Sequence, residues 1–539
     1  MTRGVRSKLL LTTVLVVALL ATGVVPAFAC TSIPVGKGAS VDGSVLTTHT
    51  DDCGYCDPRV FLIPPADHKE GAMRPVYSTP SFRSPDDPYF EPLVLQGEIP
   101  QVKHTYGYFF GSYGMMNEKQ VALGETTIGN RKGLNTPTGM FDVVELSKIA
   151  LERSATAREA IAVMGALAEE YGYRDSGECL TVADPNEVWL FEIMGSTPLH
   201  DSAVWAAQRV PDDHISVSAN RSRIGEIDLS NPDYFMASKN IFSVAEEMEW
   251  WSPTSGKPFV FYEIYAPKAN VYNSRREWRV LSLVAPSLDL DPWSARFPFS
   301  VKPDKKVSVD FINSIQRDHY EGTEFDLTKG LAAGPFGTPD RWATPGSQGG
   351  AWERAISIFR AAYTWTAQLR NWLPDEVGGV LWFGSDTAHA TVYVPFYAGI
   401  AKLPEAYTIG TTMKFNKDAA WWVFDFVENF ANLKYSYMIK DIQAKQKELE
   451  GREFAMQPAI DMAAADLWKQ SPALAREFLT QYCVSNGTSV VKAYWDFAES
   501  LIVKYNDGYL NDPKVGSSVG YPAEWLKGVG FGPLPVPTK

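Results

Sequence analysis

The feature that most constrains this chain is a cysteine placed directly behind an export signal. Residues 1–29 begin with three basic residues, continue through an almost wholly apolar run at 9–25, and end in Ala-Phe-Ala. This order is typical of a secretory signal, and the apolar run is too short and wrongly flanked for a membrane span. Cleavage after Ala29 would make Cys30 the first residue of a secreted or extracytoplasmic chain.

An N-terminal cysteine carries both a nucleophile and a base. A thiol attacks only as thiolate and needs a proton acceptor. A free α-amine has a pKa of about 7.7, close to working pH, whereas the same nitrogen inside a chain is an amide. Cleavage would therefore create both groups at once. A lipidated cysteine is an alternative, although Ala27 and Phe28 replace the usual leucine and small residue. An ordinary disulfide cysteine is another.

The cysteine count supports a free thiol. The chain has five cysteines, which are Cys30, Cys53, Cys56, Cys179 and Cys483. Export implies an oxidising compartment in which cysteines tend to pair, and an odd count leaves one over. If the other four form two bridges, Cys30 is the remaining thiol; the pairing itself cannot be read from the sequence.

Composition excludes several classes of partner. The formal net charge of −13 gives no electrostatic footprint for nucleic acid or anionic lipid, so we expect neither nucleic acid nor, after cleavage, a membrane as a partner. The length of 539 residues allows an ample core. Numerous aromatic residues (16 Trp, 24 Tyr and 28 Phe) predict a packed globule and favour an aromatic-lined cleft.

Strand and helix patterns favour an α+β layered body. Strand-like runs at 31–35 and 45–50 flank a turn-rich segment and predict a hairpin that returns the chain beside Cys30. Two registers are open: paired positions sum either to 85, with Cys30 opposite Tyr55, or to 79, with Cys30 opposite His49. In both, the hairpin brings His49, Asp51 and Asp52 near Cys30.

The rest of the chain alternates strands, helices and strands before a helical end. We expect strands around an Asn117-Glu118 turn, two helices within 141–171, and hairpins turned at 184–186 and 211–213. More strands follow at 377–399, and then a mostly helical region. The predicted organisation is a signal peptide at 1–29, a body at 30–415, and a mainly helical extension at 416–539 packed on the same body.

A short polar segment, HTDDCGYCD at 49–57, raises the question of a metal site. It holds one histidine, three carboxylates and two cysteines, but it lacks the second ligand pair that zinc spacing requires. A local disulfide or a polar active-site wall is favoured, with a metallopeptidase as the alternative. A G-S-S-V-G stretch at 516–520 resembles a nucleophile elbow, but no Asp or His follows Ser518.

Five blocks of sequence together carry a family resemblance. The chain resembles the secreted dipeptidases related to dipeptidase A, cysteine peptidases of the N-terminal-nucleophile hydrolase superfamily. The blocks are CTSIPVGKGASVDGSVLTTHTDD, GEIPQVKHTYGYFFGSYGMMNEKQVALGETTIGNR, TAREAIAVMGALAEEYGYRDSGECLTVADPNEVWLFEIMG, VWAAQRVPDDHISVSANRSRI and SRREWRVLSLVAPSL.

The resemblance implies an αββα sandwich, two facing antiparallel sheets with helices outside. It implies hydrolysis of a dipeptide or small amide through an acyl-enzyme on Cys30, without metal or cofactor. Alternatives are an acylase of the same superfamily, acting on an N-acyl amino acid, penicillin V or a conjugated bile salt, and a lipid-anchored binding protein without catalysis. A homo-oligomer is compatible with each of these.

The resemblance also implies roles for individual residues. Asp52 would orient the α-amine, and Asn220 would donate to the oxyanion. His49 stands where the relatives carry an arginine, so the role of that cation is open. Arg276 matches a distal active-site arginine, with Arg275 as the competing position.

Other roles are inferred from what a dipeptide requires. A dipeptide's ammonium would need a carboxylate, for which Asp51 or Glu125 are candidates, and its carboxylate would need a cation such as Arg276. A second asparagine of the relatives is missing here, because residues 125–127 are Glu-Thr-Thr. Backbone N–H groups are therefore expected to complete the oxyanion hole.

Overall fold

The computed structural model describes residues 30–134, 136–196, 200–268, 270–342, 353–511 and 517–532. The predicted signal peptide at 1–29 lies outside the described residues, as does part of the tail.

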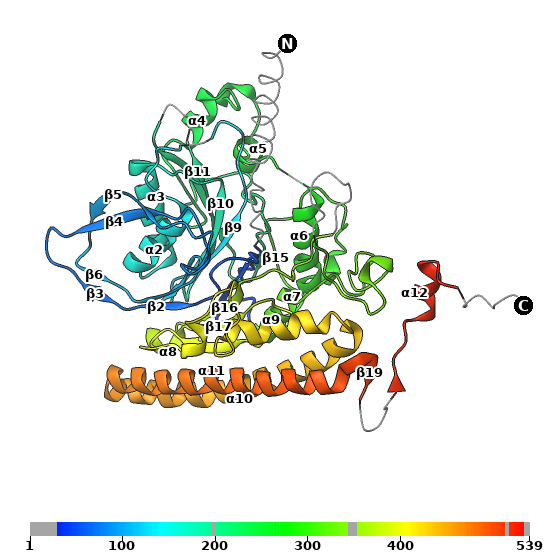
Figure 1. Cartoon of the computed structure of the whole chain (residues 1–539). Coiled ribbons are helices and arrows are strands. Elements are labelled where there is room, and N and C mark those ends of the chain that lie inside the picture. The colour runs from blue at the N-terminus through cyan, green and yellow to red at the C-terminus, as the bar shows by residue number, and fades with distance from the viewer. Residues whose placement is uncertain are drawn as a thin grey trace, which may run out of the picture.

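A large antiparallel sheet forms one half of the body. Eight strands run in the order β14-β12-β11-β10-β9-β8-β7-β2. Their bounds are β2 Phe61–Ile63, β7 Tyr108–Phe110, β8 Gly114–Asn117, β9 Ala122–Thr127, β10 Glu178–Ala183, β11 Val188–Gly195, β12 Ala203–Val210 and β14 Phe235–Ala237. Helices α2, Val143–Arg153, and α3, Ala157–Tyr171, cover its outer face (Figure 1). The Asn117 turn, the hairpin at 184–186 and the two helices are confirmed, and Thr156 caps α3.

A smaller antiparallel sheet faces the first. Its four strands run in the order β1-β16-β17-β18. Their bounds are β1 Val45–Asp51, β16 Tyr363–Leu369, β17 Val380–Ser385 and β18 Val394–Tyr397. Every residue of these strands is buried, because each lies between two layers. The two sheets touch where the Thr47 and Thr181 hydroxyls hydrogen bond at 2.6 Å.

Helices cover the other face of the small sheet. They are α7 Val309–Gln316, α9 Ala420–Ala431, α10 Tyr435–Gln470 and α11 Pro472–Tyr505. The last two form a long antiparallel hairpin along one side of the molecule (Figure 1). The predicted helical region is thus confirmed, and the layers follow the order helix, sheet, sheet, helix. None of the described helices combines the length and apolarity needed to cross a bilayer.

The N-terminal hairpin forms, but in neither predicted register. Val35 pairs with Leu46, so paired positions sum to 81 and Cys30 comes opposite Asp51. The backbone ladder does not continue toward Cys30. Instead, the N–H groups of Thr31 and Ile33 donate to the hydroxyls of Thr50 and Thr48 at 3.0 and 2.9 Å. The threonine side chains, which the turn-based prediction ignored, replace backbone partners and fix the register.

The predicted hairpin at 211–213 is wrong. After β12 the chain leaves the large sheet, and β13, Ile215–Ser216, pairs with β15, Ser300–Val301. The turn residues are as expected, but they connect strands of different sheets. The chain then runs alongside Ser32, whose backbone N–H and carbonyl hydrogen bond with those of Ser218. Asn220, two residues further on, therefore lies next to the N-terminal segment.

The remaining strands and α-helices of the described residues belong to neither main sheet. They are β3 Ala66–Asp67, β4 Met73–Ser78, β5 Val94–Pro100, β6 His104–Thr105, β19 Tyr509–Leu510, β20 Ser517–Ser518, α4 Ile241–Glu247, α5 Phe261–Tyr265, α6 Val271–Val284, α8 Asp375–Gly378 and α12 Ala523–Gly528. Of these, α6 matters most for the site, because it presents Arg276 to Cys30.

Candidate active site

Cys30 lies fully buried between the two sheets. Its sulfur receives a hydrogen bond from the backbone N–H of Asp52. Burial, reinforced by the carboxylates of Glu125, Asp52 and Asp51, raises the pKa of the thiol well above its usual value. The thiol is therefore protonated at neutral pH and depends on a base to become a nucleophile.

Arg276, and not Arg275, is the arginine at Cys30. Its Nη1 donates to the Cys30 carbonyl at 2.8 Å and to the Thr31 hydroxyl at 2.9 Å, and its Nη2 donates to Asn220 Oδ1 at 2.8 Å. The remaining donors reach the carbonyls of Ala219 and Tyr272. All five N–H groups are thus used within the chain. Arg276 is placed to position the nucleophile, and it has no donor left for a substrate carboxylate.

Arg275, the next residue on α6, lies in a different environment. It pairs with Glu353 at 3.3 Å, and its guanidinium lies over the Phe325 ring at 3.4 Å. This resolves the ambiguity between the two adjacent arginines.

Asn220 is held in a conformation that suits asparagine. Its φ is 62°, in the left-handed region that asparagine tolerates better than most residues. One N–H of its amide donates to the Thr127 carbonyl at 2.9 Å, and its oxygen accepts from Arg276. The side-chain amide of Asn273, on α6, donates a hydrogen bond to the backbone carbonyl of Asn220 at 3.0 Å. The amide is thus fixed in position with a second N–H available.

Asp52 forms a buried ion pair with Arg354. Burial raises the pKa of this carboxyl, while Arg354 and Arg276 oppose the rise. No pattern in the sequence pointed to Arg354, which lies 302 positions away. Asp52 therefore lies near Cys30, as predicted, and is paired with a cation that the sequence analysis did not anticipate.

His49 is near Cys30, but it is not a replacement for a permanent cation. Burial lowers the pKa of the ring to about 4, so the imidazole is neutral at neutral pH. Its Nδ1 contacts the backbone of Glu125, at 2.9 Å from the carbonyl and 3.1 Å from the nitrogen. His49 thus links β1 to β9 and supplies a neutral imidazole to the site.

Glu125, a predicted site residue, has a second carboxyl group beside it that was not predicted. Glu125 and Glu178 lie side by side on adjacent strands β9 and β10, close enough to share a proton. Burial raises the pKa of both, and the neighbouring Glu125 raises that of Glu178 further. Glu178 was missed because pairing of β9 with β10 brings it to the site. The signal in the sequence was an acidic residue in an otherwise apolar strand.

Asp51 is a third buried carboxyl. Ser112 donates to its Oδ2 at 2.7 Å, and Oδ1 has no hydrogen-bond partner among the described residues. Burial raises the pKa of Asp51 to about 8. Together with Glu125 and Glu178 it makes one wall of the site acidic, which suits a substrate ammonium group.

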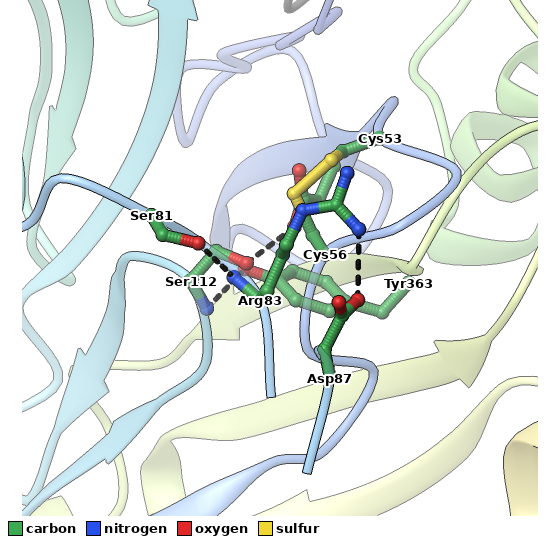
Figure 2. The surroundings of a disulfide bond; sticks show 8 residues. Cys53, Cys56, Ser81, Arg83, Asp87, Ser112 and Tyr363 are labelled. Carbon is green, nitrogen blue, oxygen red and sulfur yellow. Dashed lines mark hydrogen bonds and ion pairs between the residues drawn. A yellow bond between two sulfur atoms is a disulfide. The ribbon is translucent and has the colours of Figure 1, made fainter. Parts of the chain in front are cut away.

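A disulfide closes the segment after Asp52. Cys53 and Cys56 are bonded, as the local-disulfide interpretation predicted. Figure 2 shows this bond beside Arg83 and near the Ser112 and Tyr363 pair. An intact disulfide cannot supply thiolate ligands, which argues against metal binding by the 49–57 segment through its cysteines.

The two-bridge arrangement is wrong. Cys179 and Cys483 are free and buried, like Cys30, because they lie in separate parts of the core. The thiols of this chain therefore cannot be assigned from their odd number alone.

The site combines a thiol, a neutral imidazole and several carboxyls around one small volume. The ligand-type atoms of Cys30, His49 and Glu125 lie within 4.8 Å of one another. These residues could hold a soft divalent ion such as Zn²⁺, since thiolate and imidazole are its usual ligands. Without a metal, the same groups suit attack by sulfur on a carbonyl next to a positively charged substrate end.

Comparison with known proteins identifies the class. The family model described as peptidase family C69 matches residues 29–448. A protein named probable dipeptidase, from Latilactobacillus sakei, is 27% identical over 495 residues, which cover 88% of this chain and 95% of that protein. Dipeptidase A of Lactobacillus helveticus is 26% identical over 420 residues, covering 75% of this chain and 82% of that protein. A dipeptidase of Bifidobacterium longum (strain NCC 2705) is 26% identical over 430 residues, 73% and 75% of the two chains.

The family model and the named relatives identify a hydrolase of peptide bonds. The chain belongs to peptidase family C69. The predicted resemblance to the dipeptidase A group is thereby confirmed.

Proposed function

We propose that this protein is an exported cysteine dipeptidase of the N-terminal-nucleophile type, activated when cleavage after Ala29 frees the α-amine of Cys30. The observation that carries the proposal is the position of Cys30. The first residue behind a signal-like segment is buried at the centre of a charged site, between an acidic wall and two arginines. The helix, sheet, sheet, helix order of the layers supports the superfamily assignment.

In the proposed mechanism the α-amine accepts the thiol proton, directly or through a water molecule. The Cys30 sulfur attacks the carbonyl carbon of the peptide bond, and the free N–H of Asn220, with backbone N–H groups, stabilises the oxyanion. One such donor contributes about 3 kcal/mol to transition-state stabilisation. The protonated amine gives its proton to the leaving amine, and water then hydrolyses the thioester. Asp52 holds the α-amine, and Arg276 holds the backbone of Cys30.

The acidic wall favours a substrate with a free amino group. Asp51, Glu125 and Glu178 carry raised pKa values because they are buried near one another. A substrate ammonium would favour the ionised forms of these carboxyl groups. Binding of the substrate would therefore be coupled to the release of a proton from one of them. An acylase substrate, whose nitrogen is acylated, would gain nothing from this wall. This favours the dipeptidase over the acylase alternative.

The first test is N-terminal sequencing of the exported protein together with kinetics of Cys30→Ala. We expect a mature chain that begins at unmodified Cys30, and a folded Cys30→Ala variant with activity reduced at least 1000-fold, roughly the loss seen when a nucleophile is removed. A variant chain that retains one residue before Cys30 should also be inactive. A chain that starts elsewhere, or an acylated N-terminus in an active enzyme, would refute the mechanism.

The second test separates the substrate classes. Glu125→Gln should raise KM for dipeptides at least tenfold, and leave any cleavage of N-acyl amino acids or penicillin V unchanged. The matched control is Glu98→Gln, an exposed residue of β5. Loss of activity on adding a chelator, with recovery on adding Zn²⁺, would instead support a metallopeptidase, for which the structure offers Cys30, His49 and Glu125 as ligands.

A further inference from the structure

A second buried cluster of ligand-type side chains lies outside the contacts around Cys30. It contains Asp340, His389 of the β17–β18 connection, and Glu428 of α9, whose ligand-type atoms lie within 4.8 Å of one another. The three residues are 7%, 4% and 3% exposed. The proposed peptidase mechanism uses none of them.

One atom of this cluster lacks a partner. Glu428 Oε1 is buried and accepts no hydrogen bond from the described residues. It faces His389 Nε2 at 3.9 Å, which is too long for a hydrogen bond. A metal ion lies about 2.0–2.2 Å from a histidine nitrogen or a carboxylate oxygen, so one ion can bridge atoms up to about 4.2 Å apart. The two atoms are therefore within reach of one bound ion.

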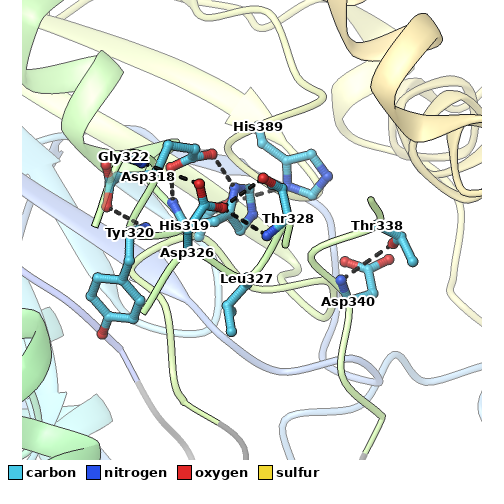
Figure 3. Close-up of polar contacts among 12 residues, drawn as sticks. Asp318, His319, Tyr320, Gly322, Asp326, Leu327, Thr328, Thr338, Asp340 and His389 are labelled. Atoms are coloured by element: carbon cyan, nitrogen blue, oxygen red, sulfur yellow. Dashed lines mark hydrogen bonds and ion pairs between the residues drawn. The ribbon is translucent and has the colours of Figure 1, made fainter. Parts of the chain in front are cut away.

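The neighbouring contacts orient the three side chains. His389 Nδ1 hydrogen bonds with the Ser357 hydroxyl at 3.0 Å, which leaves Nε2 for the cluster. Asn432 donates to Asp340 Oδ2 at 2.7 Å. Support of this kind, in which the outer atom of a ligand is hydrogen bonded, is typical of metal sites. Figure 3 shows His389 and Asp340, which come from stretches about 50 residues apart in the sequence.

The charge balance also favours a cation. The carboxyl groups of Asp340 and Glu428 lie close enough to share a hydrogen bond, and Asp386 and Asp425 add further acidic groups nearby.

We propose that Asp340, His389 and Glu428 form a structural site for one divalent transition-metal ion, with Zn²⁺ and Mn²⁺ the best matched to one imidazole and two carboxylates. The ion would tie α9 to the β17–β18 connection and to the stretch that carries Asp340. Through Ser357 it would also steady the segment that carries Arg354, the partner of Asp52.

The test measures metal content and thermal stability of the full exported protein, so it does not depend on peptidase activity. Purified without chelator, the protein should contain about one equivalent of Zn²⁺ or Mn²⁺ by mass spectrometry. After stripping with EDTA, Zn²⁺ or Mn²⁺ in excess should raise Tm, because an ion that binds only the folded state stabilises it. Mg²⁺ and Ca²⁺ should have little effect.

Variants locate the ion. Glu428→Gln should lose the metal and the rise in Tm, and Asp340→Asn is the second variant if the first does not fold. Glu448→Gln, on the exposed face of α10, is the matched control and should keep both. Cys30→Ala should also keep both; loss of the metal in Cys30→Ala would place the ion at the active site and overturn the proposal. A metal-free protein whose Tm responds to neither Zn²⁺ nor Mn²⁺ would overturn it as well.

Discussion

Arg276 Nη1 donates to the carbonyl oxygen of Cys30 at 2.8 Å, while Nη2 of the same guanidinium donates to Asn220 Oδ1 at 2.8 Å. One planar group therefore fixes the backbone of the nucleophile and the amide proposed to bind the oxyanion. Burial, together with the neighbouring Arg354, lowers the pKa of Arg276 to about 10, which still leaves it charged at neutral pH. The relative position of nucleophile and oxyanion donor depends on the shape of this side chain as well as on its charge.

Arg276→Lys should reduce kcat roughly 100-fold or more, the scale of losing one oxyanion donor, because lysine keeps the charge but cannot make the five directed hydrogen bonds. KM should change much less, since the guanidinium has no donor free for substrate. Steady-state kinetics on a dipeptide would measure both constants. The control is Arg275→Lys, which changes the adjacent buried arginine and should lower Tm without a selective loss of kcat. Equal loss of kcat in both variants would argue against a positioning role.

Asp51 makes stability depend on pH. Its folded pKa is about 8, above the unfolded value of about 3.9, so the folded protein holds a proton that the unfolded chain has lost. The stabilising effect of this proton is fully present below pH 4 and is lost as pH rises toward 8. The free energy of unfolding should therefore fall by up to about 1.4 kcal/mol per pH unit in this window from Asp51 alone.

Asp51→Asn should remove that contribution. The free energy of unfolding of the variant should therefore decline less between pH 5 and pH 8 than that of the wild type, measured at intervals of about one pH unit. Urea unfolding of wild type and variant at each pH gives the slope directly. Asp418→Asn, at an exposed position, provides the control. Identical slopes for wild type and Asp51→Asn would contradict the assignment.

The sequence predicted the local part of this site and missed the part made by distant contacts. Cys30, Asp51 and Asp52 could be brought together because a short turn connects their strands, although threonine hydroxyls set a different register. Glu178 and Arg354 could not be found in this way. The first reaches the site through pairing of β9 with β10, and the second through a loop more than 300 residues away.

The same distinction explains the errors. A turn motif predicts that the chain reverses, but it does not show which sheet the next strand joins, and so the predicted hairpin at 211–213 was wrong. The layer order was predictable from the family resemblance, whereas the choice of Arg276 over Arg275 depended on the orientation of α6. The cysteine pairing needed the distances between residues that only the fold provides.

The Cys53–Cys56 disulfide should contribute modestly to stability. It closes a loop of three-residue separation, for which the chain-entropy model gives about 2 kcal/mol. Its larger effect should be on activity, because the N–H of Cys53 donates to the Asp51 carbonyl at 2.8 Å next to the acidic wall. The double variant Cys53→Ser/Cys56→Ser should therefore show a larger relative change in KM than in Tm. Cys483→Ser, which changes a buried free thiol far along the chain, is the comparison; a KM as altered as that of the double variant would contradict the local effect.

A buried ion triad holds the two segments that carry Asn220 and Arg276. Glu277, next to Arg276 on α6, pairs with both Arg221 and Arg223, which follow Asn220, and Arg221 Nε donates to it at 2.6 Å. Glu277→Gln would leave two buried guanidiniums without the carboxylate that they share. Removing one partner of such a group costs about 3–5 kcal/mol, so we expect a loss of this size in urea unfolding. Activity should fall at temperatures where the variant is still folded, because the ion triad no longer holds the segments of Asn220 and Arg276 together.

The control is Glu263→Gln, on the exposed side of α5. A Glu277→Gln variant with the same stability and the same kcat as this control would show that the triad does not hold the site together.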